Sequence, residues 1–174
     1  MPRLPQLKAK DQLPEAHRDV HDYLVKTRGA VSRGYSVLLN SPDLAGRIAH
    51  TGSYVRFESR LPDDLRELAA LTASTEMGNA YERGIHARDC ANLGIDAALV
   101  DAVLTQKPLD GFAAEETLSV RCGRELLRDH RLSTATFDEA RQRLGDQGVV
   151  DLIGNVGYYT MLACLHVGLE VAES

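Results

Sequence analysis

Cysteine is scarce in this sequence, and its spacing argues against several kinds of site. The chain has three cysteines, Cys90, Cys122 and Cys164, which lie far apart. None of them forms a CxxC pair, so a zinc ribbon or a dithiol redox centre has no support. An odd, scattered set is typical of a protein in a reducing compartment rather than of a disulfide framework. We therefore expect a cytoplasmic protein, and the first residues agree because they lack the apolar segment of a secretory signal.

An excess of positive charge is also absent. The formal net charge is -5, whereas a protein that binds duplex nucleic acid normally carries a basic face. We therefore expect no nucleic-acid partner. Glycine, with 14 residues, and proline, with 6, are too few for a collagen-like chain. What is present is 174 residues with an apolar fraction of 44%, which suits one soluble domain with a single core.

Helical periodicity and capping signals run along the chain, whereas no segment alternates convincingly with a period of two. Ser41-Pro42-Asp43, for example, combines a hydroxyl cap, a proline at the first helical position and an acid in the first turn. The sequence predicts an all-α single domain over residues 14–174, preceded by a flexible N-terminal arm at 1–13. The expected helices lie at 15–27, 42–58, 63 to a break at 77–79, 79–92, 96–104, 113–130, 134–144 and 146–171.

The last of these helices is long and apolar enough to raise the question of a membrane span. Its apolar part, Val149 to Val171, is interrupted by Asp151, Asn155, His166 and Glu170. A spanning helix usually needs about twenty consecutive and mostly apolar residues. We therefore expect a helix buried by its neighbours or by another subunit, and no membrane partner.

A polar face marks the helix expected at 79–92. Glu82 and His86 are four residues apart, so they lie one turn apart on the same face. Asn79 and Cys90 continue that face in the two directions. A carboxylate beside an imidazole can hold one ring nitrogen while the other exchanges a proton with a substrate. The spacing alone leaves open an ordinary Glu–His pair, either on the surface or satisfied inside the core.

The chain resembles the carboxymuconolactone decarboxylase family, within the wider group of alkylhydroperoxidase D-like proteins. The resemblance covers residues 28–171 and rests on an ordered set of short motifs. These are Arg28-Gly29 followed by Tyr35 and Leu38-Leu39-Asn40-Ser41-Pro42, then Tyr54-Val55-Arg56-Phe57-Glu58-Ser59, Leu65-Arg66-Glu67-Leu68-Ala69, Tyr81-Glu82 with His86, and Gly148-Val149-Val150-Asp151-Leu152 leading to Gly157-Tyr158-Tyr159. The resemblance implies an alkylhydroperoxidase D-like helical bundle and a homo-oligomer, commonly a trimer or a hexamer.

The resemblance also bears on the chemistry. The peroxidase branch carries a C-x-x-C-x-x-x-H motif on this helix and a glutamate twelve residues before its first cysteine. With His86 on the motif histidine, Asn79 and Glu82 occupy the cysteine positions and Glu67 that of the glutamate. Peroxide reduction in that branch needs a thiolate and a resolving thiol, which neither Asn nor Glu supplies. The resemblance therefore favours the decarboxylase-like branch, a lyase without a cofactor that acts on a small carboxylated substrate of lactone or aromatic catabolism. Two alternatives stay open: a thiol peroxidase that uses Cys90, and a non-catalytic ligand-binding or scaffold oligomer.

The decarboxylase reading assigns roles to particular residues. His86 is the expected proton donor, Glu82 orients it or shares its proton, and Glu67 is a second acid or a structural anchor. A substrate carboxylate would need an arginine, and Arg56 and Arg28 fit the family pattern; each could instead bridge helices or complement a helix end. The further expected substrate-binding residues are Asn79 and Tyr158, the latter through a hydroxyl that reaches the pocket.

Two features stand apart from this reading. The family often has a tryptophan after the motif glutamate and a second histidine beside the first, where this chain has Arg83, Ile85 and Ala87. His17 and His21 have the spacing of a metal-binding pair, but no third ligand is apparent. We therefore expect no metal and no cofactor.

Overall fold

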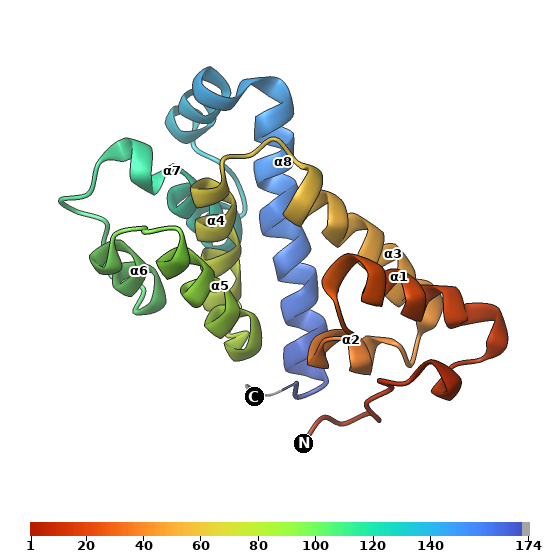
Figure 1. Cartoon of the computed structure of the whole chain (residues 1–174). Helices are drawn as coiled ribbons and strands as arrows, with labels where there is room; N and C mark the ends of the chain where they lie inside the picture. Colours follow the sequence, from red (N-terminus) through yellow and green to blue (C-terminus); the bar gives the residue numbers. More distant parts are fainter. Residues whose placement is uncertain (172–174) are drawn as a thin grey trace.

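The computed structural model describes residues 1–171, and within them there is no β-strand. The all-α expectation for the fold is therefore confirmed (Figure 1). Residues 172–174 of the expected domain lie outside the described residues. The helices are α1 (Arg18–Arg28), α2 (Arg33–Leu38), α3 (Pro42–Ser53), α4 (Asp63–Glu76), α5 (Ala80–Asn92), α6 (Ala97–Leu104), α7 (Ala114–Arg124) and α8 (Thr134–Gly168).

Local sequence signals account for where most of these helices begin. Asn79 caps α5 by accepting from the backbone N–H of Glu82, and Asp96 caps α6 by accepting from that of Ala98. Such a cap satisfies one of the N–H groups that lack an intrahelical partner. The expected break between α4 and α5 is confirmed at Gly78, whose φ of 66° is unfavourable for a residue with a Cβ.

Three details differ from the expected helices. A further helix, α2, lies between the first two expected helices. The helices expected at 42–58 and 113–130 each end in a five-residue π-helical turn, Tyr54–Glu58 and Glu125–Asp129. The last two expected helices are joined as α8, which bends at Gly145, where φ is 70° and ψ 178°. Only glycine adopts that backbone conformation readily, so the bend is encoded in the sequence.

α4 lies at the centre of the bundle and packs against α5, α7 and α8 (Figure 1). Its small residues Ala69, Ala70 and Ala73 have no exposed surface, which lets the neighbouring backbones approach closely. Leu71 is also fully buried, and burial of one leucine side chain contributes about 1.5–3 kcal/mol. This packing fixes α4 and α5 side by side and so brings Glu67 next to His86.

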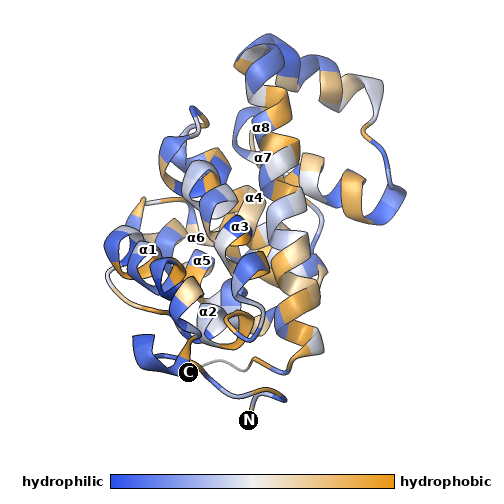
Figure 2. Cartoon of the chain, turned by 90° about the vertical axis from the view of Figure 1, so that its right-hand side faces the viewer, coloured by the Kyte–Doolittle hydropathy of each residue, from blue (hydrophilic) through white to orange (hydrophobic). Residues whose placement is uncertain are grey.

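α8 is the one helix in the described part of the chain that is long and apolar enough to cross a membrane, judged by length and composition. Half of its most apolar window is buried inside the fold, as a core helix requires. Hydrophobic residues also lie on its outer side (Figure 2), where Val150, Ile153, Met161 and Val167 are exposed. Such an uncovered apolar face is typical of a surface that meets another molecule.

The first thirteen residues run along the outside of the bundle. The backbone N–H of Arg3 donates to the carbonyl oxygen of Leu169 at 2.9 Å, and that of Leu7 to Ser36 at 2.7 Å. Leu13 is buried in the core. The segment thus has defined contacts, and its expected flexibility stays a prediction.

Candidate functional site

The polar face of α5 is turned into the protein. Glu82, His86 and Cys90 are its buried residues, and Asn79 at the helix cap is also buried. The opposite face of α5 is more exposed, which fits the small and charged residues found there. The surface-pair interpretation of Glu82 and His86 is therefore wrong, because the pair lies inside the protein.

His86 lies between two carboxylates. Its Nδ1 is 2.6 Å from Oε2 of Glu67 on α4, and its Nε2 is 3.5 Å from Oε2 of Glu82 one turn away. The first distance is that of a short charge-assisted hydrogen bond, and the second is longer than an ordinary one. The Tyr159 ring of α8 packs edge-on against the imidazole, with 4.5 Å between the ring centroids. Glu67 is thus the closest partner of His86, a role that the sequence left open between second acid and anchor.

Burial and charge act in opposite directions on these three groups. Burial alone would lower the pKa of His86, but the hydrogen bonds and negative charges of Glu67 and Glu82 outweigh it and raise that pKa. Burial alone would raise the pKa of both carboxyl groups, but the hydrogen bond and positive charge of His86 outweigh it and lower them. Arg56 adds to the lowering at both carboxyl groups. These opposite shifts favour a protonated imidazole held between two carboxylates.

A second histidine, His166 on α8, also contacts Glu82. Its Nδ1 is 3.4 Å from Oε1 of Glu82 and 3.4 Å from Nδ2 of Asn79. Sequence reasoning assigned His166 to the core or an interface rather than to the site. No local signal could have found it, because its helix reaches Glu82 only through the tertiary fold.

A cavity of about 270 Å³ lies beside Glu82, between α2, α5 and α8, and we call it the main cavity. Glu82 and His166 line it, whereas His86 and Asn79 are not among its lining residues. Glu82 is therefore the member of the carboxylate–imidazole chain that faces the cavity. The cavity is also lined by two arginines, three tyrosines and a glycine, which are Arg28, Arg56, Tyr35, Tyr158, Tyr159 and Gly34.

Arg28 and Arg56 both line the main cavity, as expected for carboxylate-binding residues. Arg28 is already committed in part, because its Nη2 donates to the carbonyl oxygen of Ala49 at 2.8 Å. Arg56 has a weaker partner, since 3.9 Å separates its Nη2 from Oδ2 of Asp89. Burial would lower the pKa of Arg56, but Tyr159 and the surrounding carboxylates outweigh it and raise that pKa. Arg56 is thus a permanent cation with capacity left for a ligand.

Tyr158 also reaches the main cavity, and its hydroxyl lies 3.1 Å from that of Tyr35. Asn79, in contrast, is 1% exposed and uses its side chain on the α5 cap and on His166. Asn79 is not among the residues that line the main cavity, because capping the helix directs its amide toward the backbone. Its expected contact with substrate stays a prediction.

None of the cysteines lines the main cavity. Cys90 has no exposed surface and packs against the aliphatic side chains of Leu68 and Leu99. Burial raises the pKa of its thiol to about 12. Cys122 is buried as well, and Cys164 is exposed on α8. A thiol with so high a pKa is protonated at neutral pH and is a poor nucleophile.

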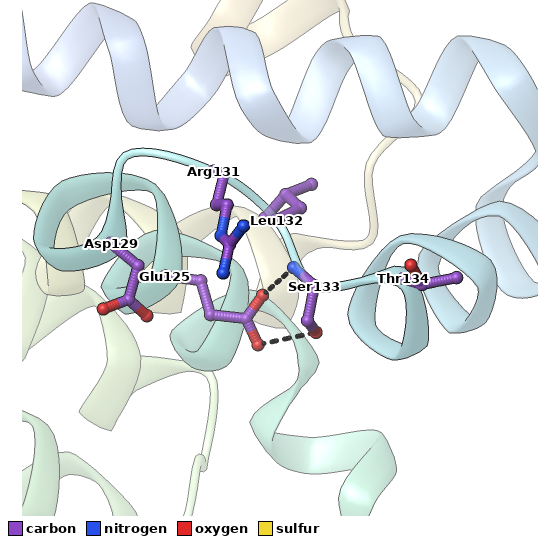
Figure 3. Close-up of a pocket in the computed structure, with 6 residues that line it drawn as sticks. All are labelled: Glu125, Asp129, Arg131, Leu132, Ser133 and Thr134. Carbon is purple, nitrogen blue, oxygen red and sulfur yellow. Dashed lines mark hydrogen bonds between the residues drawn. The ribbon is translucent and has the colours of Figure 1, made fainter.

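Two other features lack this combination of groups. A pocket of about 800 Å³ lies where the π-turn after α7 meets α8, and Figure 3 shows its lining residues. There Glu125 accepts from the backbone N–H of Ser133 at 2.7 Å and thereby holds the start of α8.

Glu67, His86 and Asp89 bring possible metal-ligand atoms within 4.8 Å of one another. A cation there would have to displace the proton between His86 and Glu67, so we assign no metal to them.

Comparison with known proteins found one family pattern, and it covers this site. Residues 42–125, which carry Arg56, Glu67, Asn79, Glu82 and His86, match the pattern of the carboxymuconolactone decarboxylase family. A search of curated proteins found no match.

Two solved structures share the fold over almost the whole chain. One is an uncharacterized peroxidase-related protein from Silicibacter sp., with a TM-score of 0.76 and 16% identity over 99% of this chain and 92% of that one. The other is an uncharacterized peroxidase-related protein with an alkylhydroperoxidase AhpD core from Ralstonia eutropha. Its TM-score is 0.80, and its identity is 14% over 99% of this chain and 92% of that one. At such low identity the likeness shows the fold alone.

Proposed function

We propose that this protein, which matches the carboxymuconolactone decarboxylase family over residues 42–125, is a cofactor-independent lyase that removes carbon dioxide from a small carboxylated substrate. The observation that carries the proposal is the buried chain of contacts from Glu67 through His86 to Glu82. It ends at the main cavity, which Arg28 and Arg56 also line. A buried chain of this kind stores a proton next to the substrate, and the arginine supplies an attachment point for an anion.

The main cavity suits one step of such a reaction in particular. Tyr35, Tyr158 and Tyr159 contribute aromatic walls, so a carboxylate bound there would be partly removed from water. Desolvation favours loss of carbon dioxide because the charge spreads as the bond breaks. Arg56 would hold a second carboxylate of the substrate, which leaves the departing one in the less polar part of the cavity.

The proton that replaces carbon dioxide would come from the buried chain. The carbon–carbon bond to the carboxylate breaks, and its electron pair enters the conjugated system of the substrate. Glu82 then delivers a proton to the carbon, and His86 supplies that proton through Nε2, at a separation of 3.5 Å in the resting state. Glu67 stays ionised and holds the imidazole in place through Nδ1. Positioned acid catalysis of this kind contributes about 10²–10⁴-fold.

Thiol chemistry has less support than acid–base chemistry at this site. The buried position of Cys90 and its raised pKa leave no thiolate near the main cavity at neutral pH. A non-catalytic oligomer would not need a protonated imidazole between two buried carboxylates, which is costly to desolvate.

The expected assembly also becomes a proposal. The exposed apolar side chains of α8, Val150 and Val167 among them, favour a homo-oligomer, which light scattering of the purified protein would measure. A monomer at micromolar concentration would contradict it.

The experiment that tests the lyase is release of carbon dioxide from 4-carboxymuconolactone and from related unsaturated carboxylates, with peroxide consumption measured in parallel. We expect carbon dioxide release by the wild type and by Cys90→Ser, and its loss in His86→Asn. Peroxide consumption that depends on Cys90 would contradict the proposal, and so would carbon dioxide release that survives His86→Asn.

A further inference from the structure

His166 is the one imidazole on the main cavity for which the proposed reaction has no role so far. It is 2% exposed, and its Nδ1 lies 3.4 Å from both Glu82 and Asn79. Its ring also meets Tyr81 edge-on, at 5.3 Å between centroids. The ring is therefore held from several sides, which is how a protein fixes a group that must point in one direction.

The contacts of Nδ1 indicate which nitrogen of His166 carries the proton. Two groups lie 3.4 Å from Nδ1, and of these the amide of Asn79 has hydrogen-bond geometry, whereas Oε1 of Glu82 is within ion-pair distance only. The Oδ1 of Asn79 accepts from the backbone N–H of Glu82, so the amide oxygen is committed to the helix. Its NH₂ group must then face His166, and it donates to Nδ1 at 3.4 Å. A neutral imidazole that accepts at Nδ1 carries its proton on Nε2.

The fold leaves room around that Nε2. Gly34 of α2 faces it, and a Cβ at this position would lie 2.6 Å from Nε2. Gly34 and His166 both line the main cavity. A residue with any side chain would cover the nitrogen, whereas glycine leaves its N–H accessible from the cavity.

The two imidazoles next to Glu82 also differ in charge. Burial lowers the pKa of His166, and the negative charge of Glu82 offsets that only in part. The pKa of His86 is raised instead, because two carboxylates face it. The surroundings thus favour the cationic form of His86 and the neutral form of His166. Environments that separate the pKa values of neighbouring groups indicate different roles for them.

We propose that His166 is a second substrate-contacting residue, which donates its neutral Nε2–H to a carbonyl oxygen of the substrate. This inference rests on the proposed lyase function and narrows the substrate to a carboxylate conjugated with a carbonyl group. When the bond to the carboxylate breaks, its electron pair moves through the conjugated system onto that oxygen, which becomes an enolate. The donated hydrogen bond stabilises the enolate until Glu82 protonates the carbon and the carbonyl re-forms.

Asn79→Asp tests the tautomer without any substrate. Aspartate still caps α5, but it replaces the NH₂ donor by an acceptor and therefore draws the proton of His166 to Nδ1. We expect ¹⁵N NMR of the wild type at pH 7 to show His166 neutral with its proton on Nε2, and Asn79→Asp to move it to Nδ1. The His166 signals are assigned by their absence in His166→Gln. A wild-type ring that is cationic, or that carries its proton on Nδ1, would overturn the inference.

The probe coumalate, a planar lactone that carries a ring carbonyl conjugated with a carboxylate, tests the contact itself. We expect it to shift the Nε2–H resonance of His166 in the wild type, and saturation without such a shift would overturn the contact. In turnover, the glutamine of His166→Gln places an amide N–H near the position of Nε2, whereas His166→Leu has no donor. We expect His166→Leu to lose about 100-fold in kcat, the usual effect of removing one such donor, and His166→Gln to recover most of it with little change in KM.

Equal losses in the two variants would overturn the donor role. If no tested substrate is turned over while the tautomer and the probe shift are as stated, the lyase proposal fails and the contact made by His166 stands.

Discussion

Replacement of Glu67 by glutamine would measure how much the buried carboxylate contributes to stability. Glu67→Gln keeps the shape of the side chain but removes its charge, so His86 exchanges a charge-assisted hydrogen bond of 2.6 Å for a neutral one. Both side chains are nearly inaccessible, with exposures of 0% for His86 and 10% for Glu67, so solvent screening is weak. Hydrogen bonds to charged groups contribute about 1.5–3 kcal/mol, and we expect a loss of that size near pH 6.

The sign of the pH dependence follows from the two shifts. The folded-state pKa of Glu67 lies below its ordinary value of 4.5, so its contribution is present above that value and is lost as the pH falls through the folded pKa. The folded-state pKa of His86 lies above its ordinary value of 6.5, so its contribution is present below that value and is lost as the pH rises through the folded pKa. The pair therefore stabilises the protein most between about pH 4.5 and 6.5.

Urea unfolding of wild type and Glu67→Gln across the pH range is the assay. We expect the difference in free energy of unfolding to be largest in that window and to shrink at both ends. Arg66→Gln is a matched control. It removes a charge that lies 3.7 Å from Glu67 but leaves the hydrogen bond between Glu67 and His86 in place. A difference of the same size at every pH would refute the argument, since it would show that the proton on His86 plays no part.

Three further variants test the surroundings of the site. Gly34→Ala would place a Cβ 2.6 Å from Nε2 of His166, so we expect about 1–3 kcal/mol of destabilisation in urea unfolding and an altered His166 NMR signal. Gly52→Ala would collide with the Tyr158 hydroxyl, so we expect a similar loss of stability and weaker binding of coumalate, measured by calorimetry. Cys90→Ser would bury an unpartnered hydroxyl among aliphatic side chains, so we expect a lower melting temperature and unchanged turnover. Stability equal to that of the wild type in any of them would contradict the packing described here.

The fold could be predicted largely from local sequence signals. Pro42, Asn79 and Asp96 act over a few residues, and helices begin where these residues indicate. The expected hydroxyl cap at Ser41 is wrong, because its side chain makes no cap hydrogen bond. The π-turns after α3 and α7 could not be predicted, because they depend on how the helix end packs rather than on a cap. The bend in α8 was detectable at Gly145 as a boundary between two helices, but its backbone angles were not.

The site was only partly predictable. Glu82 and His86 share a helix face, so their spacing sufficed to pair them, whereas Glu67 came from the family resemblance alone. Which carboxylate lies closer to His86 was not predictable, because the 2.6 Å contact of His86 with Glu67 depends on the packing of α4 against α5. His166 was missed because α8 brings it to Glu82 from far along the chain.

The most direct test of the central claim is carbon dioxide release by Glu82→Gln beside the wild type, with folding checked by circular dichroism. Glutamine can fill the space of Glu82 but cannot carry a proton from His86 to the main cavity. We expect a folded variant whose kcat is at least about 100-fold lower, consistent with the loss of a positioned acid. A folded Glu82→Gln that releases carbon dioxide at the wild-type rate would contradict the claim that protons reach the substrate through Glu82.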